Sequence, residues 1–265
     1  MSEIAARSAS GLALVLAILG ALFLGSPVWA ILCSSVALVS LFEYYSMLSR
    51  SYHVSRGIGY GAAALILLLT STGGNERVIV PVLAFSVFLV FLVEIVRRHV
   101  TGASDIVKNA GGTISGLLYV VLPWGFLIML RDLPWGLYLL VALFTCTWSA
   151  DVGAYLTGSM WGKTPLCPAV SPKKTFEGFL GGLAGALLCG GALSFLWNTR
   201  PLPVLLIALV CGTFGQMGDL AESLLKRESG VKDSGTIIPG HGGMLDRFDS
   251  ILISSVLVFL AFGVW

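Results

Sequence analysis

Carboxylates lie inside or beside strongly apolar stretches in the C-terminal half of the chain. Asp151 and Asp219 each fall within an apolar run, and Asp246 and Asp249 stand three residues apart just before the last run. On insertion scales a carboxylate at the centre of a bilayer costs about 2.5 to 3.5 kcal/mol, so each of these residues requires a compensating partner. Mg²⁺ is such a partner, because it prefers carboxylate and phosphate oxygens as ligands. The pattern therefore predicts a magnesium site in which two or three aspartates, together with phosphate oxygens of a substrate, bind the ion.

The spacing around Asp219 places further polar residues on the same helical face. Glu222 and Ser223 follow it by three and four positions, the separation at which side chains of one helix are neighbours. The alternative is that these groups are solvated at the membrane interface or paired with the nearby Lys226 and Arg227. We favour a metal or substrate site over solvation, because Asp246 and Asp249 repeat the spacing of Asp219 and Glu222.

Two other acidic residues lie in the N-terminal half. Glu43 and Glu94 are each within reach of a helix end, so solvation at the interface or local pairing is the favoured interpretation. We therefore expect the substitution Glu43→Gln to retain measurable activity.

Basic residues accompany the C-terminal carboxylates, namely Lys163, Lys173, Lys174, Lys226, Arg227, Lys232 and Arg247. A metal site combined with cations that bind phosphate is typical of phosphoryl and nucleotidyl transferases, in which positioning and charge neutralisation carry most of the catalysis. The stretch from Pro239 through Gly240, His241, Gly242 and Gly243 permits a backbone nest whose N–H groups bind an anion. A second glycine-rich stretch, residues 158–164, departs from a Walker loop, because three residues instead of four separate its glycines.

The composition indicates a membrane protein. Of 265 residues, 56% are hydrophobic and 11% are charged, against about 25% charged residues in soluble domains. Apolar runs span residues 11–25, 28–48, 57–72, 78–96, 112–130, 134–159, 178–197, 202–225 and 250–265. They are too long and too uniformly apolar for the alternating strands of a membrane barrel.

We therefore expect an all-α, polytopic integral membrane helix bundle of about nine transmembrane helices. It would form one membrane domain over residues 1–265, with N-terminal helices in 1–131 and catalytic helices and loops in 132–265.

The distribution of basic residues predicts the topology. All Lys and Arg residues except Arg77, Arg131 and Arg200 fall in loops on one side of the nine runs. Under the positive-inside rule, that side is cytoplasmic, together with the N-terminus and the two longest loops, 161–177 and 226–249. This arrangement corresponds to a bacterial-type inner membrane protein whose active site faces the cytoplasm. The net charge of +2 gives no reason to expect a nucleic-acid partner.

The first apolar run and the five cysteines each suggest an alternative. The run 11–25 resembles a cleavable secretory signal, but the apolar pattern resumes at once, which favours a helix that stays in the membrane. The five cysteines have no CxxC spacing and four lie in apolar runs, so neither a disulfide framework nor a zinc site is indicated.

Residues 223–249 resemble the signature of the phosphatidate cytidylyltransferases, or CDP-diacylglycerol synthases. The matching positions are Ser223, Lys226, Arg227, Lys232, Asp233, Pro239, Gly240, His241, Gly242, Gly243, Asp246, Arg247 and Asp249. Residues 171–178 resemble another loop of that family, and Asp151, Tyr155, Gly162 and Lys163 resemble the helix before it. One departure is Ala150, where a more polar residue would be expected before Asp151.

The resemblance implies transfer of CMP from CTP to phosphatidic acid, giving CDP-diacylglycerol and pyrophosphate. It implies Mg²⁺ as the cofactor, with room for a second cation (Mg²⁺ or K⁺), and a homodimer among membrane lipids. The implied catalytic residues are Asp219, Asp246, Asp249, Lys226 and His241, with Asp151 joining the three aspartates as metal ligands. The implied substrate-binding residues are Ser171, Lys173, Lys174, Thr175, Ser223, Arg227, Lys232, Asp233, Gly242, Gly243 and Arg247. We expect a polar cavity between the helices that opens to the cytoplasm and laterally to the lipid.

Two alternatives remain at this point. An ion-coupled transporter would also carry intramembrane carboxylates, but such proteins usually show two similar halves, whereas the dense charge here is C-terminal. A CTP-dependent polyprenol or phytol kinase would need the same metal and phosphate groups with a hydroxyl acceptor. Label from α-labelled CTP in lipid would indicate the cytidylyltransferase, and label from γ-labelled CTP would indicate the kinase.

Overall fold

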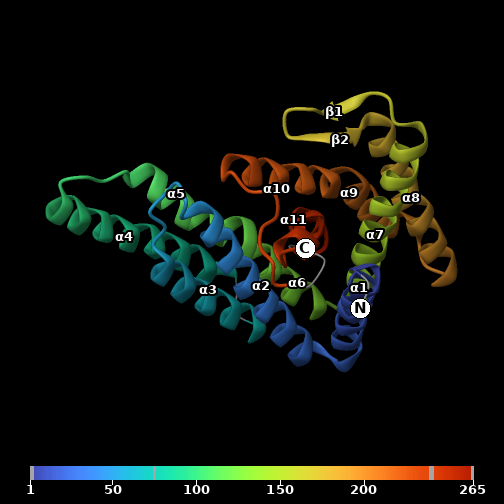
Figure 1. Ribbon diagram of the computed structural model, residues 1–265. Coiled ribbons are helices and arrows are strands. Elements are labelled where there is room, and N and C mark those ends of the chain that lie inside the picture. Colours follow the sequence, from blue (N-terminus) through green and yellow to red (C-terminus); the bar gives the residue numbers. More distant parts are fainter. Residues whose placement is uncertain (1–2, 74–75, 239–241, 264–265) are drawn as a thin grey trace. The chain divides into compact units, whose positions relative to one another are not determined.

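The computed structural model describes residues 3–73, 76–238 and 242–263, and most of them are helical (Figure 1). The chain divides into two compact units. The first unit comprises Met1–Met129 and Asp233–Leu245, and the second comprises Leu130–Lys232 and Asp246–Trp265. A short stretch of the signature, residues 233–245, thus belongs to the unit formed by the N-terminal helices.

Within the described residues, six helical segments are long and apolar enough to cross a membrane. They are Ser26–Leu48, Arg77–Thr101, Ile106–Arg131, Gly136–Trp161, Phe176–Leu196 and Pro201–Glu228. Three shorter apolar helices, Ser10–Leu24, Arg56–Ser71 and Asp249–Phe262, correspond to the other predicted runs. The prediction of an all-α polytopic membrane protein is therefore confirmed, while the count of nine crossings stays a prediction.

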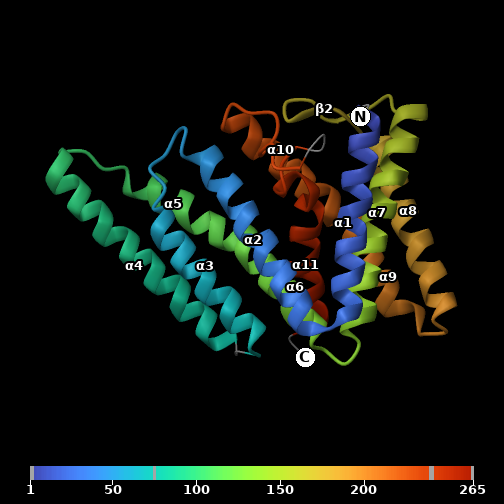
Figure 2. The ribbon, with the colours of Figure 1, turned by 60° about the horizontal axis from the view of Figure 1, so that its bottom comes forward.

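The first unit is built from the N-terminal helices. These are α1 (Glu3–Leu24), α2 (Ser26–Leu48), α3 (Arg56–Ser71), α4 (Glu76–Thr101), α5 (Ile106–Gly116), the π-helical turn η1 (Leu117–Val121) and most of α6 (Leu122–Arg131). Gly25 separates α1 from α2 at a φ of 109°, in the region that favours glycine, and α2 then begins with a proline in its first turn. Figure 2 shows α3 and α4 running side by side.

Tyr45 packs α2 against α3 and α5 in the first unit. Its ring lies against Gly59 of α3 and Gly116 of α5, where a Cβ atom on either glycine would collide with the ring. Its hydroxyl donates a hydrogen bond of 2.7 Å to the carbonyl of Thr113. Since the ring is fully buried, this packing fixes the helix that carries Glu43.

The second unit holds the remaining helices. These are α7 (Gly136–Trp161), α8 (Phe176–Leu196), α9 (Pro201–Val210), the π-helical turn η2 (Cys211–Gly215), α10 (Gln216–Glu228), the 3-10 turn η3 (Leu245–Arg247), which begins at the end of the first unit, and α11 (Asp249–Phe262). Both ribbon views show α7 and α8 side by side (Figures 1 and 2). A Cβ atom at Gly153 would lie 2.5 Å from the carbonyl oxygen of Gly181, so glycine permits this close approach.

A β-hairpin connects α7 to α8, where the sequence predicts only a loop. Its strands β1 (Pro165–Cys167) and β2 (Ser171–Thr175) pair antiparallel. The strands are too short, and too rich in proline and lysine, to show an alternating pattern in the sequence. Thr175 caps α8, because its Oγ1 accepts a hydrogen bond of 3.1 Å from the backbone N–H of Gly178.

Candidate active site

The predicted phosphate-binding loop and the predicted metal-binding helix meet in the second unit. Lys174 Nζ, on β2, lies 2.7 Å from Asp219 Oδ2, on α10. Arg227, in the last turn of α10, donates a hydrogen bond of 3.3 Å from its Nε to the carbonyl of Val170 in the hairpin turn. The hairpin and α10 are thus connected at both a predicted substrate residue and a predicted metal ligand.

Lys226 joins two carboxylates in the interior of the second unit. Its Nζ lies 2.5 Å from Glu222 Oε2 and 2.7 Å from Asp246 Oδ1. The side chains of Lys226, Glu222 and Asp246 are 13%, 0% and 5% exposed, respectively. The ammonium group is therefore held between two acidic groups, and it ties α10 to η3.

The remaining predicted metal ligands converge near Asp219. Asp151 of α7 interacts electrostatically with Asp219, Lys174 and Arg247. Asp249, the first residue of α11, interacts with Asp219 and Asp151. Helices α10 and α11 approach closely at Gly218, where a Cβ atom would lie 2.7 Å from the carbonyl oxygen of Asp249. Three helices therefore bring three of the four predicted aspartates into one electrostatic cluster.

The donor set has the chemistry of a magnesium site, since it consists of carboxylate oxygens with cationic side chains beside them. Among the described residues, no three His, Cys, Asp or Glu side chains are arranged closely enough to hold an ion together. Lys174 is the ion-pair partner of Asp219 and Lys226 that of Asp246. The metal assignment of Asp151, Asp219, Asp246 and Asp249 therefore stays a prediction.

The other predicted substrate residues of the second unit are distributed around this cluster. Lys173, Lys232 and Arg247 are exposed, Ser171 is partly exposed, and Thr175 serves as the cap of α8. Ser223 lies beside Asp219, with its Oγ 3.4 Å from Asp219 Oδ1. The sequence was correct in expecting these two residues to share a helical face.

The hairpin is further held by an acidic residue that the sequence analysis left without a role. Glu177, in the first turn of α8, accepts hydrogen bonds from the backbone N–H of Lys163 at 3.1 Å and from the backbone N–H and hydroxyl of Thr164, the latter at 2.8 Å. Because these donors directly precede β1, Glu177 closes the base of the hairpin that carries Lys173 and Lys174.

The predicted residues Asp233, Gly242 and Gly243 belong to the first unit. Gly242 has a φ of 83°, which a residue with a side chain rarely adopts. Its carbonyl accepts a hydrogen bond of 3.0 Å from the N–H of Ile238. Pro239, Gly240 and His241 lie outside the described residues, so the predicted catalytic role of His241 is not addressed by the structure.

Neither Glu43 nor Glu94 is solvated, because their side chains are 1% and 2% exposed; of the two expected alternatives, local pairing is confirmed for Glu94. Glu94 is paired locally, with Arg97 Nε 3.3 Å away and the Ser104 hydroxyl donating at 2.7 Å. Glu43 instead accepts hydrogen bonds from Ser234, Met244 and Leu245, about 200 positions further along the chain. A carboxylate within the 23-residue apolar helix α2 was the available signal, but its partners were not visible from the sequence.

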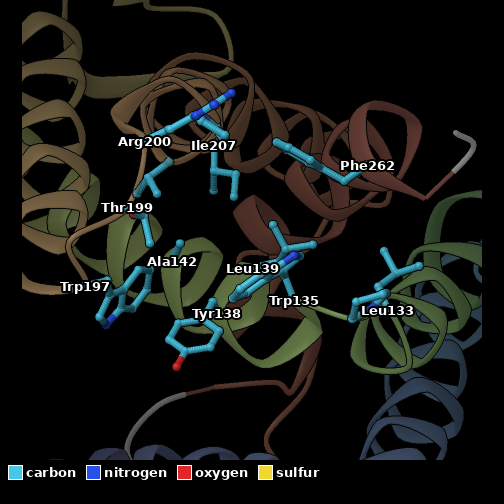
Figure 3. A pocket seen from close by; sticks show the side chains of 13 residues that line it. Leu133, Trp135, Tyr138, Leu139, Ala142, Trp197, Thr199, Arg200, Ile207 and Phe262 are labelled. Carbon is cyan, nitrogen blue, oxygen red and sulfur yellow. The ribbon is translucent and has the colours of Figure 1, made fainter.

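A cavity of about 660 Å³ lies in the second unit, away from the charged cluster (Figure 3). Its lining includes Trp135 before α7, Trp197 after α8, Arg200, and Phe262 at the end of α11. Asp249 stands at the opposite end of α11, about 20 Å away for a helix of this length. This apolar cavity is therefore different from the polar cavity predicted around the aspartates.

Comparisons with known proteins cover nearly the whole chain. The model of the Cytidylyltransferase family matches residues 5–265. Proteins named phosphatidate cytidylyltransferase are similar to it: that of Staphylococcus aureus (strain COL) is 33% identical over 251 residues, covering 93% of this chain and 94% of its own length. That of Staphylococcus haemolyticus is 32% identical over 250 residues, covering 93% of this chain and 94% of its own length. That of a Synechocystis species is 46% identical over 131 residues, covering 49% of this chain and 44% of its own.

Proposed function

Because the chain belongs to the cytidylyltransferase family, we propose that it is an enzyme that transfers CMP from CTP to phosphatidic acid. An oxygen of the lipid phosphate forms a bond to the α-phosphorus of CTP. The bond between that phosphorus and the oxygen bridging it to the β-phosphate breaks, and pyrophosphate leaves. The products are CDP-diacylglycerol and pyrophosphate. The observation that carries this proposal is the cluster of aspartates and cations formed by β2, α7, α10, η3 and α11.

The chemical difficulty is that one anion must approach another. The nucleophile is already charged at neutral pH, so the reaction needs no serine, histidine and aspartate triad to activate it. It needs groups that neutralise the triphosphate and orient the two phosphates. The arrangement of Lys174 beside Asp219 supports this role, because a phosphate group that enters there meets a lysine already held at 2.7 Å from a carboxylate.

The cofactor in this proposal is Mg²⁺, held by Asp219, Asp246 and Asp249 with Asp151 nearby. When bound, it would neutralise negative charge on the phosphates of the nucleotide. A second cation, Mg²⁺ or K⁺, is part of the proposal. The electrostatic interaction of Asp249 with both Asp219 and Asp151 supports it, because converging carboxylates are stabilised by a cation.

The side chains of the second unit then have separate roles. Lys173, Lys174 and Lys232 bind the triphosphate and the departing pyrophosphate, with Ser171, Thr175 and Ser223 beside them. Arg227 and Arg247 bind the lipid phosphate. Lys226 keeps Asp246 in position, because its ammonium group is shared with Glu222. The resemblance to the family adds Asp233, Gly242 and Gly243 to the substrate-binding residues and His241 to the catalytic residues of this proposal.

The site faces the cytoplasm of a bacterial-type inner membrane in this proposal. The distribution of Lys and Arg supports that orientation. CTP would enter from water through a polar cavity, and phosphatidic acid would enter sideways from the leaflet. Its acyl chains then stay in hydrocarbon, which avoids a cost of about 0.8 kcal/mol per CH₂ group. The protein would act as a homodimer, for which mass photometry in nanodiscs is the direct test.

A comparison of acceptors tests the activity. The purified protein in nanodiscs is supplied with CTP, Mg²⁺ and either phosphatidic acid, diacylglycerol or a polyprenol, and the release of pyrophosphate and the formation of CDP are both measured. We expect pyrophosphate release with phosphatidic acid only, and no CDP with any acceptor. Turnover of CTP with an alcohol acceptor, and none with phosphatidic acid, would contradict the proposal.

A further inference from the structure

A buried carboxylate in α2 organises a loop that is remote in the sequence. Glu43 is 1% exposed, and both of its carboxylate oxygens are hydrogen bonded to the described segments 233–238 and 242–245, which together we call the signature loop. Oε1 accepts a bond of 2.9 Å from the N–H of Met244, and Oε2 accepts a bond of 2.8 Å from the N–H of Leu245. Oε2 also accepts a bond of 3.1 Å from the hydroxyl of Ser234. All of these residues belong to the first unit.

These contacts fasten the signature loop at its two ends. Ser234 lies near the start of the loop, and Met244 and Leu245 form its end. One side chain therefore holds together two points of the backbone ten residues apart. An additional hydrogen bond, from the N–H of Ile238 to the carbonyl of Gly242, connects the two segments of the loop directly.

Glycines in the loop allow the carboxylate to come this close. A Cβ atom at Gly235 would lie 2.5 Å from Glu43 Oε1, and one at Gly243 would lie 2.7 Å from Glu43 Oε2. Real Cβ atoms essentially never approach other atoms so closely, so a side chain at either position would displace the carboxylate. The glycine at position 243 is therefore required for packing against Glu43, in addition to any role in binding an anion.

We propose that Glu43 is a positioning residue for the signature loop, because its carboxylate fixes the loop backbone, to which the proposed function assigns substrate binding, before the nucleotide arrives. This inference rests on the proposed function. Glu43 touches no substrate atom in this account. Its effect is to keep Gly243 and its neighbours ordered before CTP arrives, so that less ordering entropy is lost on binding.

The hydrogen bonds explain why a carboxylate is needed and an amide is not sufficient. Each oxygen of Glu43 accepts from a different backbone N–H. A glutamine offers one oxygen, so in either orientation its NH₂ group would face an N–H donor that then has no acceptor. Glutamine preserves the volume of the side chain, so the substitution removes the hydrogen bonding with little change in packing. The expectation from the sequence that Glu43→Gln retains measurable activity is thereby refined, because we now expect weaker binding of CTP.

Glu94→Gln provides the matched control. Glu94 is in the same unit and is buried to a similar degree, with 2% of its side chain exposed. Its partners are Arg97 and Ser104, and none of them belongs to the signature loop. The two variants therefore carry the same chemical change in a membrane helix of the first unit, and only one of them contacts the loop.

The test combines steady-state kinetics with hydrogen exchange on the purified protein in nanodiscs. For Glu43→Gln we expect the KM for CTP to rise about tenfold, equivalent to about 1.4 kcal/mol, while the KM for phosphatidic acid stays unchanged. The amides of Met244 and Leu245 should exchange faster than in the wild type, and addition of CTP should restore part of their protection. Glu94→Gln should leave the KM for CTP and these exchange rates unchanged. A Glu43→Gln protein with the wild-type KM for CTP and wild-type exchange at both amides would overturn the inference.

Ser234→Ala keeps the test decisive if Glu43→Gln fails to fold. It removes one donor from Oε2 and leaves the carboxylate and the two backbone bonds in place. We expect a smaller increase in the KM for CTP in the same direction, and no change would count against the inference. Failure of the proposed function is recognised separately, since the wild type and Glu94→Gln would then both fail to transfer CMP, while exchange at Met244 and Leu245 would still report on the role of Glu43.

Discussion

Lys226 Nζ lies 2.7 Å from Asp246 Oδ1, which connects the last turn of α10 to the turn that precedes α11. The same ammonium group lies 2.5 Å from Glu222 Oε2. A lysine bound by two buried carboxylates is compensated within the protein, so its main contribution is structural order around Asp246. The exposed Lys173 is better placed to bind a phosphate that arrives from water.

Removing the charge of Lys226 should disturb both stability and activity. Lys226→Met leaves Glu222 and Asp246 buried without their cation, and breaking a buried ion pair in this way costs about 3 to 5 kcal/mol. We expect a clear fall in the melting temperature in detergent and a loss of CMP transfer. Lys226→Arg, which keeps the charge, should recover part of both. A Lys226→Met protein as stable and as active as the wild type would show that the pairing contributes nothing.

The predicted metal ligands are tested by substitutions that keep volume and remove charge. Asp219→Asn, Asp246→Asn and Asp249→Asn should each reduce turnover to the level of the assay blank, because the reaction depends on neutralising the triphosphate. Each variant should insert and remain monodisperse in detergent. Near-normal turnover at saturating Mg²⁺ in one of the three would remove that residue from the metal site.

Glu177 should act through the hairpin that carries Lys173 and Lys174. Glu177→Gln retains one acceptor for the donors of Lys163 and Thr164 and loses the other, which should loosen the base of the hairpin. We expect a several-fold higher KM for CTP and faster hydrogen exchange over residues 163–175, with little change in the melting temperature. Glu228→Gln, an exposed acidic residue at the end of α10, is the control and should behave as the wild type. Equal exchange in the two variants would argue against a role for Glu177.

Cysteine labelling from the two sides of the membrane tests the predicted topology. Thr236 and Ser71 are both exposed, and the distribution of basic residues predicts that they face opposite compartments. On a cysteine-free background, Thr236→Cys should react with an impermeant thiol reagent only when the cytoplasmic face is accessible. Ser71→Cys should react only from the other side. Labelling of both positions from one side would contradict the predicted orientation.

The sequence predicted the parts of the structure that depend on local patterns. Apolar runs marked the long helices, because a crossing segment requires about 20 apolar residues. The spacing of Asp219 and Ser223 placed them on one face. The hairpin at residues 165–175 was not predicted, because its strands have only three and five residues and show no alternation of apolar and polar side chains. The π-helical turns η1 and η2 left no recognisable signal within otherwise continuous helices.

The role of Glu43 shows the limit of a single sequence more directly. Its type and its place in an apolar helix were visible, but its position near a helix end favoured solvation or local pairing. The partners are backbone N–H groups about 200 positions away, and every residue except proline carries such a group. No side-chain pattern could therefore identify them. The three-dimensional arrangement was needed to connect Glu43 with the signature loop.

The position of the label in CTP tests the central claim most directly. The purified protein is incubated with phosphatidic acid, Mg²⁺ and CTP labelled either in the α-phosphate or in the γ-phosphate, and the lipid is extracted. We predict that the α-label enters the lipid fraction, that the γ-label is recovered in pyrophosphate, and that Asp219→Asn abolishes both. Appearance of the γ-label in lipid, with the α-label left in CDP, would show a kinase reaction and would contradict the account.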